Sequence, residues 1–128
     1  MKQTTLSDGE WKLMNLLWDE NPKTIREMVL ALEHDTGWSK SAVNMMLIRL
    51  AEKGAVRLDA TGSKKLYYPL LAREDAVRQE AKNTLEKVRA GGIGLLLSTM
   101  AEECEFSDEE IEELYAILKK GRQSHDEA

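Results

Sequence analysis

The sequence predicts a mostly α-helical protein in which three short helices and a β-hairpin are followed by a second half made only of helices. Three observations lead to this fold class. Apolar residues recur at helical spacing behind Ser or Thr capping signals, the spacing changes to alternation after Gly54, and acidic residues are concentrated in the second half. A chain of 128 residues can form two small domains, which we place at residues 1–72 and 73–128.

The first two helices are announced by capping boxes, in which a Ser or Thr side chain and a Glu three residues later satisfy each other's backbone N–H groups. Ser7–Glu10 starts a predicted helix at residues 8–19, which Asn21-Pro22 ends. Thr24–Glu27 starts the second helix, which we expect to end near His34.

The third predicted helix covers residues 38–54, with Ser39 as its cap and Gly54 as its stop signal. Its buried stripe comprises Val43, Met46, Leu47 and Leu50. The opposite face and its flanks hold Lys40, Ser41, Asn44, Met45, Ile48, Arg49 and Glu52. Such a face suits either a DNA groove or an ordinary surface. Met45 and Ile48 suit either thymine methyl groups or packing beneath the hairpin, of which packing is the favoured interpretation.

Alternating residues from Val56 to Ala60 predict a strand, residues 61–63 a turn, and Leu66–Pro69 a returning strand. The order helix–helix–helix–hairpin is that of a winged helix, a variant of the helix-turn-helix. Lys64 and Lys65 would lie at the hairpin tip.

The second half reads as three helices, Arg73–Ala90, Ile93–Met100 and one that starts at Ser107 and closes at Gly121, followed by a frayed tail at Arg122–Ala128. These helices carry too little bulk for a core of their own, so we expect them to form a dimerisation domain against a second copy. The expected interface residues are Val77, Ala81, Val88, Leu95, Leu96, Leu97, Ile111, Leu114 and Leu118.

The sequence contains no recognisable set of catalytic or metal-binding residues. His34 and His125 have no Ser or Cys partner at a recognisable spacing, and the lone Cys104 makes neither a disulfide nor a closed metal site. We therefore expect no enzyme activity, no cofactor and no resident metal. The first residues lack an apolar signal core, so we expect a cytoplasmic protein.

Net charge is −5, but it is unevenly distributed. Residues 1–72 hold ten basic and nine acidic side chains, and residues 73–128 hold eight and fourteen. This distribution permits DNA binding by the first half. The expected DNA contacts are Lys40, Ser41, Asn44, Met45, Arg49, Lys64, Lys65 and Tyr67, with Lys53 as a further phosphate candidate. Of Tyr67 and Tyr68, one should face the core and the other the solvent or DNA.

Motifs along nearly the whole chain resemble the penicillinase-repressor (BlaI/MecI/CopY-like) family of bacterial transcriptional repressors. They are LSDGEWKLMNLLW, WSKSAVNMMLIRLAEKGAV, KKLYYPL and LLLSTMAEE followed by SDEEIEELYAIL. The resemblance implies a homodimer that binds a palindromic operator upstream of resistance or stress genes. It also implies release when a membrane sensor metalloprotease, or a protease it activates, cuts the dimerisation half near Thr99-Met100.

The sequence departs from known members of that family in three places. Staphylococcal members have Asn-Phe at the cleavage position, and copper-responsive members carry Cys-x-Cys motifs that this chain lacks. Ser41, Ala42, Asn44 and Met45 replace the Lys, Thr, Arg and Thr of the staphylococcal repressors, so we expect a different operator sequence. Two alternatives stay open: a winged-helix protein-interaction module, and a regulator that responds to a small molecule without proteolysis.

Overall fold

The structure, a computed structural model, describes residues 5–127. The chain divides into two units, residues 1–84 and 85–128. Helix α5 (Arg73–Val88) is continuous across this division, and Ala76 near its start is buried in the core of the first unit. The domain boundary expected between residues 72 and 73 stays a prediction.

Three of the helices in the first unit begin at the capping residues that the sequence indicated. Helix α1 (Asp8–Asp19) starts after Ser7, α2 (Ile25–Ala31) after Thr24, and α4 (Lys40–Glu52) after Ser39. The second predicted helix is interrupted. Leu32 leaves the helical conformation (φ −101°, ψ 4°) with its side chain still in the core, and a short α3 (Glu33–Thr36) follows.

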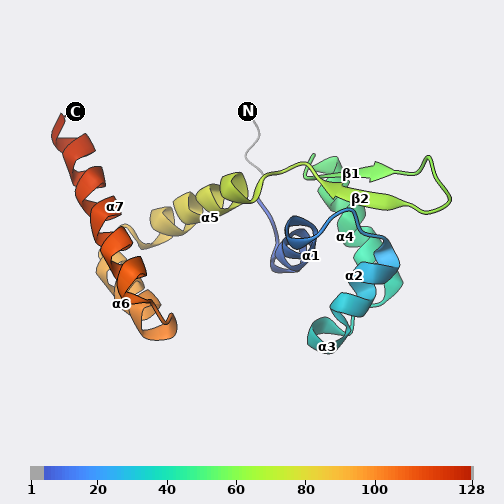
Figure 1. The fold of residues 1–128 in the computed structure, drawn as a ribbon, viewed down its shortest axis with the longest axis horizontal. Coiled ribbons are helices and arrows are strands. Elements are labelled where there is room, and N and C mark those ends of the chain that lie inside the picture. The colour runs from blue at the N-terminus through green and yellow to red at the C-terminus, as the bar shows by residue number, and fades with distance from the viewer. Residues whose placement is uncertain (1–4, 128) are drawn as a thin grey trace. The chain divides into compact units, whose positions relative to one another are not determined.

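The hairpin pairs β1 (Val56–Asp59) with β2 (Leu66–Pro69) in antiparallel register, Leu58 opposite Tyr67 (Figure 1). A contact that the sequence did not indicate holds β2 one residue pair from the hairpin tip. Lys23, in the connection between α1 and α2, exchanges two backbone hydrogen bonds with Tyr67, with N···O distances of 3.2 and 2.9 Å. The two strands therefore have a third backbone segment beside them.

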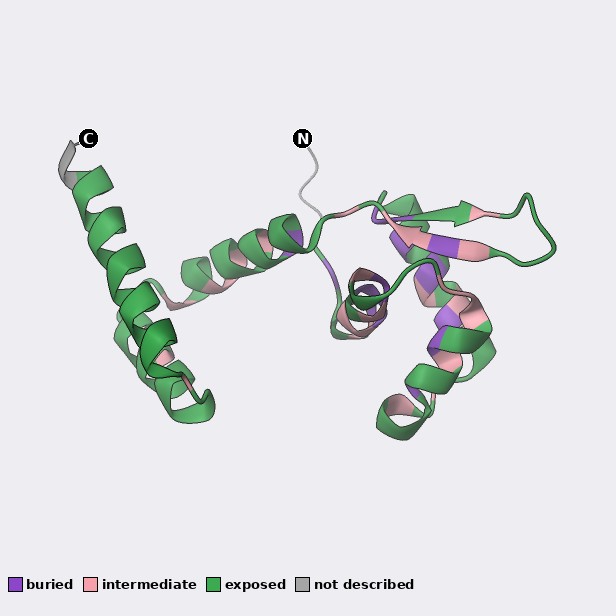
Figure 2. Cartoon of the chain, viewed as in Figure 1, coloured by how far each residue is buried: buried purple, intermediate pink, exposed green. Residues whose placement is uncertain are grey.

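The core lies where α1, α2, α4 and the hairpin meet, and buried positions gather there in Figure 2. Trp18 closes one side of this core. It meets Trp11 edge to face at 5.8 Å between ring centroids, and its indole N–H donates to the carbonyl of Leu71 at 2.8 Å. The buried apolar residues are Leu6, Leu13, Met14, Leu17, Met28, Leu32, Val43, Leu47, Leu50, Ala55, Val56, Tyr67 and Ala76.

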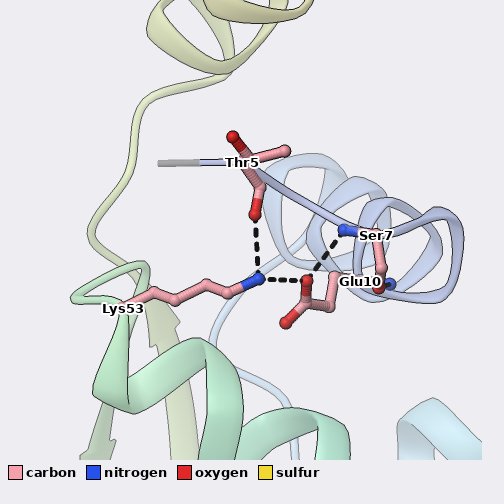
Figure 3. A network of polar contacts seen from close by, with 4 residues as sticks. All are labelled: Thr5, Ser7, Glu10 and Lys53. Carbon is pink, nitrogen blue, oxygen red and sulfur yellow. Dashed lines mark hydrogen bonds and ion pairs between the residues drawn. The ribbon is translucent and has the colours of Figure 1, made fainter. Parts of the chain in front are cut away.

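A buried carboxylate joins α1 to the end of α4 (Figure 3). One oxygen of Glu10 accepts from the backbone N–H of Ser7 at 2.8 Å and from the Lys53 ammonium at 2.5 Å. The same ammonium donates to the carbonyl of Thr5 at 2.8 Å. The Lys53 ammonium is therefore engaged by two acceptors although its side chain stays 35% exposed, and its role as a phosphate candidate stays a prediction.

The second unit contains the end of α5, helix α6 (Ile93–Glu103) and helix α7 (Asp108–Glu127). Figure 2 shows these helices exposed along nearly their whole described length. The frayed tail predicted after Gly121 is wrong, because α7 continues to Glu127. Gly121 does not adopt the positive φ that ends a helix, and so the backbone hydrogen bonding runs through it. Within residues 5–127 no helix is both long enough and apolar enough to cross a bilayer.

Candidate nucleic-acid interface

Helix α4 presents a mixed polar and apolar face outward. Val43, Leu47 and Leu50 point into the core, which fixes the rotation of the helix about its axis. The residues on the other side are exposed, apart from a half-buried Asn44: Lys40, Ser41, Met45, Ile48 and Arg49. The outward face therefore combines two cations, a hydroxyl, a carboxamide and two large apolar groups.

Met45 and Ile48 are unusual for a solvated surface. Their exposed fractions are 57% and 49%, so the favoured interpretation that they pack under the hairpin is wrong. They lie three residues apart and thus on one side of α4. This leaves two apolar side chains free on the face that also carries Ser41 and Asn44.

The tip of the hairpin, residues 60–65, is exposed and basic. Asp59 shapes it, because its carboxylate accepts hydrogen bonds from both the hydroxyl (2.6 Å) and the backbone N–H (3.0 Å) of Thr61. These hydrogen bonds lower the pKa of Asp59. Lys64 and Lys65 follow this turn and point no charge into the core.

The two tyrosines of β2 separate as expected, one inside and one outside. Tyr67 is 5% exposed, and burial raises its pKa. Tyr67 is therefore a core residue that anchors the hairpin, which corrects its expected place among the DNA contacts. Tyr68 faces outward, with the Arg57 guanidinium 4.3 Å from its ring centroid.

Arg57 is an exposed cation of the hairpin that the sequence analysis did not single out. The signal that would have found it is the strand register, which sets Arg57 directly opposite Tyr68 on the outer face of the hairpin.

Three of the expected contacts meet around one hollow. The hairpin tip, the start of α4 and α2 line an open cavity of about 640 Å³, which we call the wing cavity. Lys40, Lys64 and Lys65 line it together with Arg26, a cation that the sequence analysis did not single out. Ser41, Asn44, Met45 and Arg49 do not line it. The full lining is Thr24, Ile25, Arg26, Val29, Leu30, Lys40, Lys64 and Lys65.

The residues expected at a dimer interface lie on α5, α6 and α7. Val88 and Leu96 are half-buried, and the others are exposed, up to 72% at Leu95. Thr99 and Met100 lie inside α6, where the Thr99 hydroxyl donates to the carbonyl of Leu95 at 2.8 Å. In the described part of the chain no three His, Cys, Asp or Glu side chains gather in a way that could hold a metal ion.

Comparisons with known proteins agree with this geometry. The family model described as "Penicillinase repressor" matches residues 6–120. The methicillin resistance regulatory protein MecI of Staphylococcus aureus is 29% identical over 119 residues, which cover 93% of this chain and 97% of that protein. The penicillinase repressor of Bacillus licheniformis is 28% identical over 115 residues, which cover 90% of each.

Two solved structures match the first part of the chain. The DNA-binding domain of the repressor BlaI is 28% identical with a TM-score of 0.52, and the match covers 58% of this chain and 90% of that domain. The monomeric Bacillus licheniformis BlaI in complex with the blaP half-operator gives a TM-score of 0.51 at the same identity and coverage. The fold is thus that of the BlaI winged helix, and the chain belongs to the penicillinase repressor family.

Proposed function

We propose that this protein is a homodimeric transcriptional repressor of resistance or stress genes, which binds a palindromic operator through α4 and the hairpin. The observation that carries the proposal is the outward face of α4. It holds Ser41, Asn44 and Met45, and its Lys40 lines the same hollow as Lys64 and Lys65 of the hairpin tip. The likeness to a BlaI structure in complex with a half-operator supports the same assignment.

In this proposal α4 enters the major groove. Asn44 offers the carboxamide that pairs with both N6 and N7 of adenine, Ser41 can donate to or accept from a base edge, and Met45 meets a thymine methyl group. Lys40, Arg49, Lys64 and Lys65 bind phosphates, which set the orientation of the helix without reading sequence.

The second unit supplies the dimer. Its exposed apolar side chains bury one another across two copies, and the two winged helices then reach half-sites about one helical turn apart. Cleavage near Thr99-Met100, by a membrane sensor metalloprotease or a protease it activates, would detach α7 from the rest of the chain. Each monomer would then lose the effective concentration that the second half-site provides.

The test is operator binding by fluorescence anisotropy, with the DNA upstream of the protein's own gene and a series of salt concentrations. Lys64→Ala combined with Lys65→Ala should weaken binding to every sequence. In the dimer it should reduce the slope of log affinity against log salt by about 4, which is about 1 for each lysine of each subunit. Lys119→Ala with Lys120→Ala in α7 is the matched control and should leave the slope unchanged. An unaltered slope in the hairpin variant would refute the phosphate role.

Asn44→Ala tests base reading separately. It should change the ranking of operator variants at one position of each half-site, because a bidentate pair is worth about 1–3 kcal/mol against the wrong base. Equal weakening at all sequences would mean that Asn44 reads no base. No salt-dependent, sequence-specific binding at all would favour a protein-interaction module instead.

A further inference from the structure

We infer that the wing cavity binds an amphipathic organic anion, meaning a compact apolar body that carries one carboxylate. The cavity is formed within the first unit by α2, the start of α4 and the hairpin tip. Its volume of about 640 Å³ falls within the range of small-molecule sites in proteins.

The floor of the cavity is apolar and comes from one helix. Ile25 and Val29 are half-buried, and Leu30, one residue further along α2, is 57% exposed. Ile25 and Val29 are four residues apart and therefore lie on one side of α2, and Leu30 lines the same hollow, so the three side chains supply its apolar surface. An exposed apolar surface inside a hollow favours a ligand with an apolar body.

The rim of the cavity is cationic and comes from three elements. Arg26 belongs to α2, Lys40 to α4, and Lys64 and Lys65 to the hairpin tip. None of the four forms an ion pair within residues 5–127. The nearby Glu27 has its carboxylate engaged by the backbone N–H and hydroxyl of Thr24, at 3.0 and 3.1 Å. The charge of Glu27 also acts on Lys64, but no rim cation forms an ion pair with it, so the four cations leave the rim positive for an anion from outside.

A ligand that fits this cavity has to satisfy both the apolar floor and the cationic rim. A DNA phosphate would use the cations and leave Ile25, Val29 and Leu30 facing water. A neutral apolar molecule would use the floor and leave four positive charges close together. A carboxylate on an apolar body satisfies both, because its charge meets the rim while its body covers the floor.

A functional consequence rests on the proposed repressor function. Lys40, Lys64 and Lys65 are also the proposed phosphate contacts, so the ligand and the operator compete for the same cations. By linkage, the ligand lowers operator affinity by the factor by which the operator lowers ligand affinity. The cavity would thus allow release from DNA without cutting the chain.

The first experiment needs no DNA. The full-length protein, labelled with ¹⁵N, is titrated with naphthalene-2-carboxylate and, separately, with its neutral counterpart naphthalene-2-carboxamide. The carboxylate should shift the backbone amides of the cavity lining, among them Leu30 and Lys40, and bind at least tenfold more tightly than the carboxamide. Leu30→Asp should abolish these shifts. Leu70→Asp, at an equally exposed leucine outside the lining (58%), should preserve them.

Four results would overturn the site: no shifts in the lining, equal affinity for the carboxamide, the same shifts with inorganic phosphate alone, or shifts confined to residues 93–118. The phosphate result would mean a site for DNA phosphates that does not use the floor.

The second experiment repeats the titration with operator DNA present. The carboxylate should raise the apparent Kd of wild-type protein for DNA several-fold and leave that of Leu30→Asp unchanged. If the protein binds no operator but still binds the carboxylate, the repressor function fails and the site stands. If both bind without competition, the site stands and its regulatory role is wrong.

Discussion

At the scale of single residues, Glu10 combines two opposing influences. Its carboxylate is 2% exposed, and its second oxygen has no hydrogen-bond partner within the described residues. Burial by itself would raise the pKa of Glu10, but the hydrogen bonds and charge of Lys53 and the hydrogen bonds of Ser7 outweigh it, so the pKa is lowered. Glu10 is therefore charged at neutral pH, and Lys53 is its counter-ion.

Lys53→Met should lower the free energy of unfolding by about 1–3 kcal/mol, because it leaves a buried charge without its partner. Urea denaturation followed by tryptophan fluorescence measures this loss. Lys12→Met is the matched control. It breaks the exposed ion pair of Lys12 with Asp35 and should cost less than about 1 kcal/mol. If both variants lost the same free energy of unfolding, the burial of Glu10 would not explain the loss in Lys53→Met.

The same pair should make stability depend on pH in the acid range. The folded protein lowers the pKa of Glu10 below its ordinary value of 4.5. The charged Glu10 therefore contributes fully to the free energy of unfolding above pH 4.5, and this contribution disappears as the pH falls through the lowered pKa. Unfolding free energies at several pH values below 4.5 should therefore converge for wild type and Lys53→Met. A constant difference down to the lowest pH would show that Glu10 does not contribute through its charge.

Met45 gives a prediction about operator sequence. If its exposed side chain meets a thymine methyl group, replacing that thymine with uracil removes the contact and keeps base pairing. The affinity of wild-type protein should fall about fourfold, as expected for one buried methyl group. Binding by Met45→Ala should not respond to the replacement, whereas Lys64→Ala should respond like wild type. Anisotropy with uracil placed at each thymine in turn locates the position.

At the scale of elements, α1 is packed tightly at Gly9 against Met46 of α4 and against Trp38, which precedes α4. A Cβ at this position would lie 2.9 Å from the sulfur of Met46 and 3.2 Å from the Trp38 ring. Gly9→Ala should therefore lower the free energy of unfolding by about 1 kcal/mol, the low end of the usual cost of overpacking, because the flexible Met46 side chain can move aside. Urea denaturation measures this loss.

Gly121→Ala in α7 is the opposite case and serves as the control. Nothing lies within 4 Å of a Cβ there, and the residue is inside a helix. Ala is better than Gly in a helix interior by about 0.5–1 kcal/mol, so helicity by circular dichroism should rise. A loss of stability in both variants would mean that close packing does not explain the effect at Gly9.

The helix starts could be predicted from the sequence because their signals are local. The capping pairs at Ser7, Thr24 and Ser107 act over three residues, and the structure has each of them. The Lys23–Tyr67 bridge could not be predicted in this way, since it joins backbone groups far apart in the chain. Their side chains give no sign of it.

The candidate site was predictable only in part. The outward face of α4 follows from helical periodicity, so Lys40, Met45 and Arg49 could be placed on it. The sequence could not tell which of Tyr67 and Tyr68 faces the core, because the two adjacent side chains are equally large and aromatic. Arg26 was missed because its partners in the wing cavity come from two other elements.

At the scale of the whole molecule, the second unit leaves its apolar residues uncovered. Leu95 is 72% exposed and Leu118 is 63% exposed. Replacing both with Asp should yield a folded monomer, since charges at a dimer interface are costly and neither side chain supports the fold of a single chain. Sedimentation equilibrium measures the change. Leu58→Asp in the first unit is the control and should remain dimeric.

The monomeric variant also links assembly to DNA binding. It should lose about 10²–10⁴ in affinity for a full operator and little for a half-operator, because only the full site uses both subunits. Wild-type protein that is already monomeric at micromolar concentration would contradict the dimer proposal.

The bridge between Lys23 and Tyr67 has a consequence for how such a protein can be altered. It holds β2 to the connection between α1 and α2 at Tyr67, one residue pair from the tip, so residues 60–65 can be lengthened, shortened or exchanged without shifting the strand register. The tip then behaves as an interchangeable part. Replacing residues 60–65 while keeping the rest of the chain should change the affinity for DNA. A fluorescent label placed in the tip would report contact with DNA and disturb the core little.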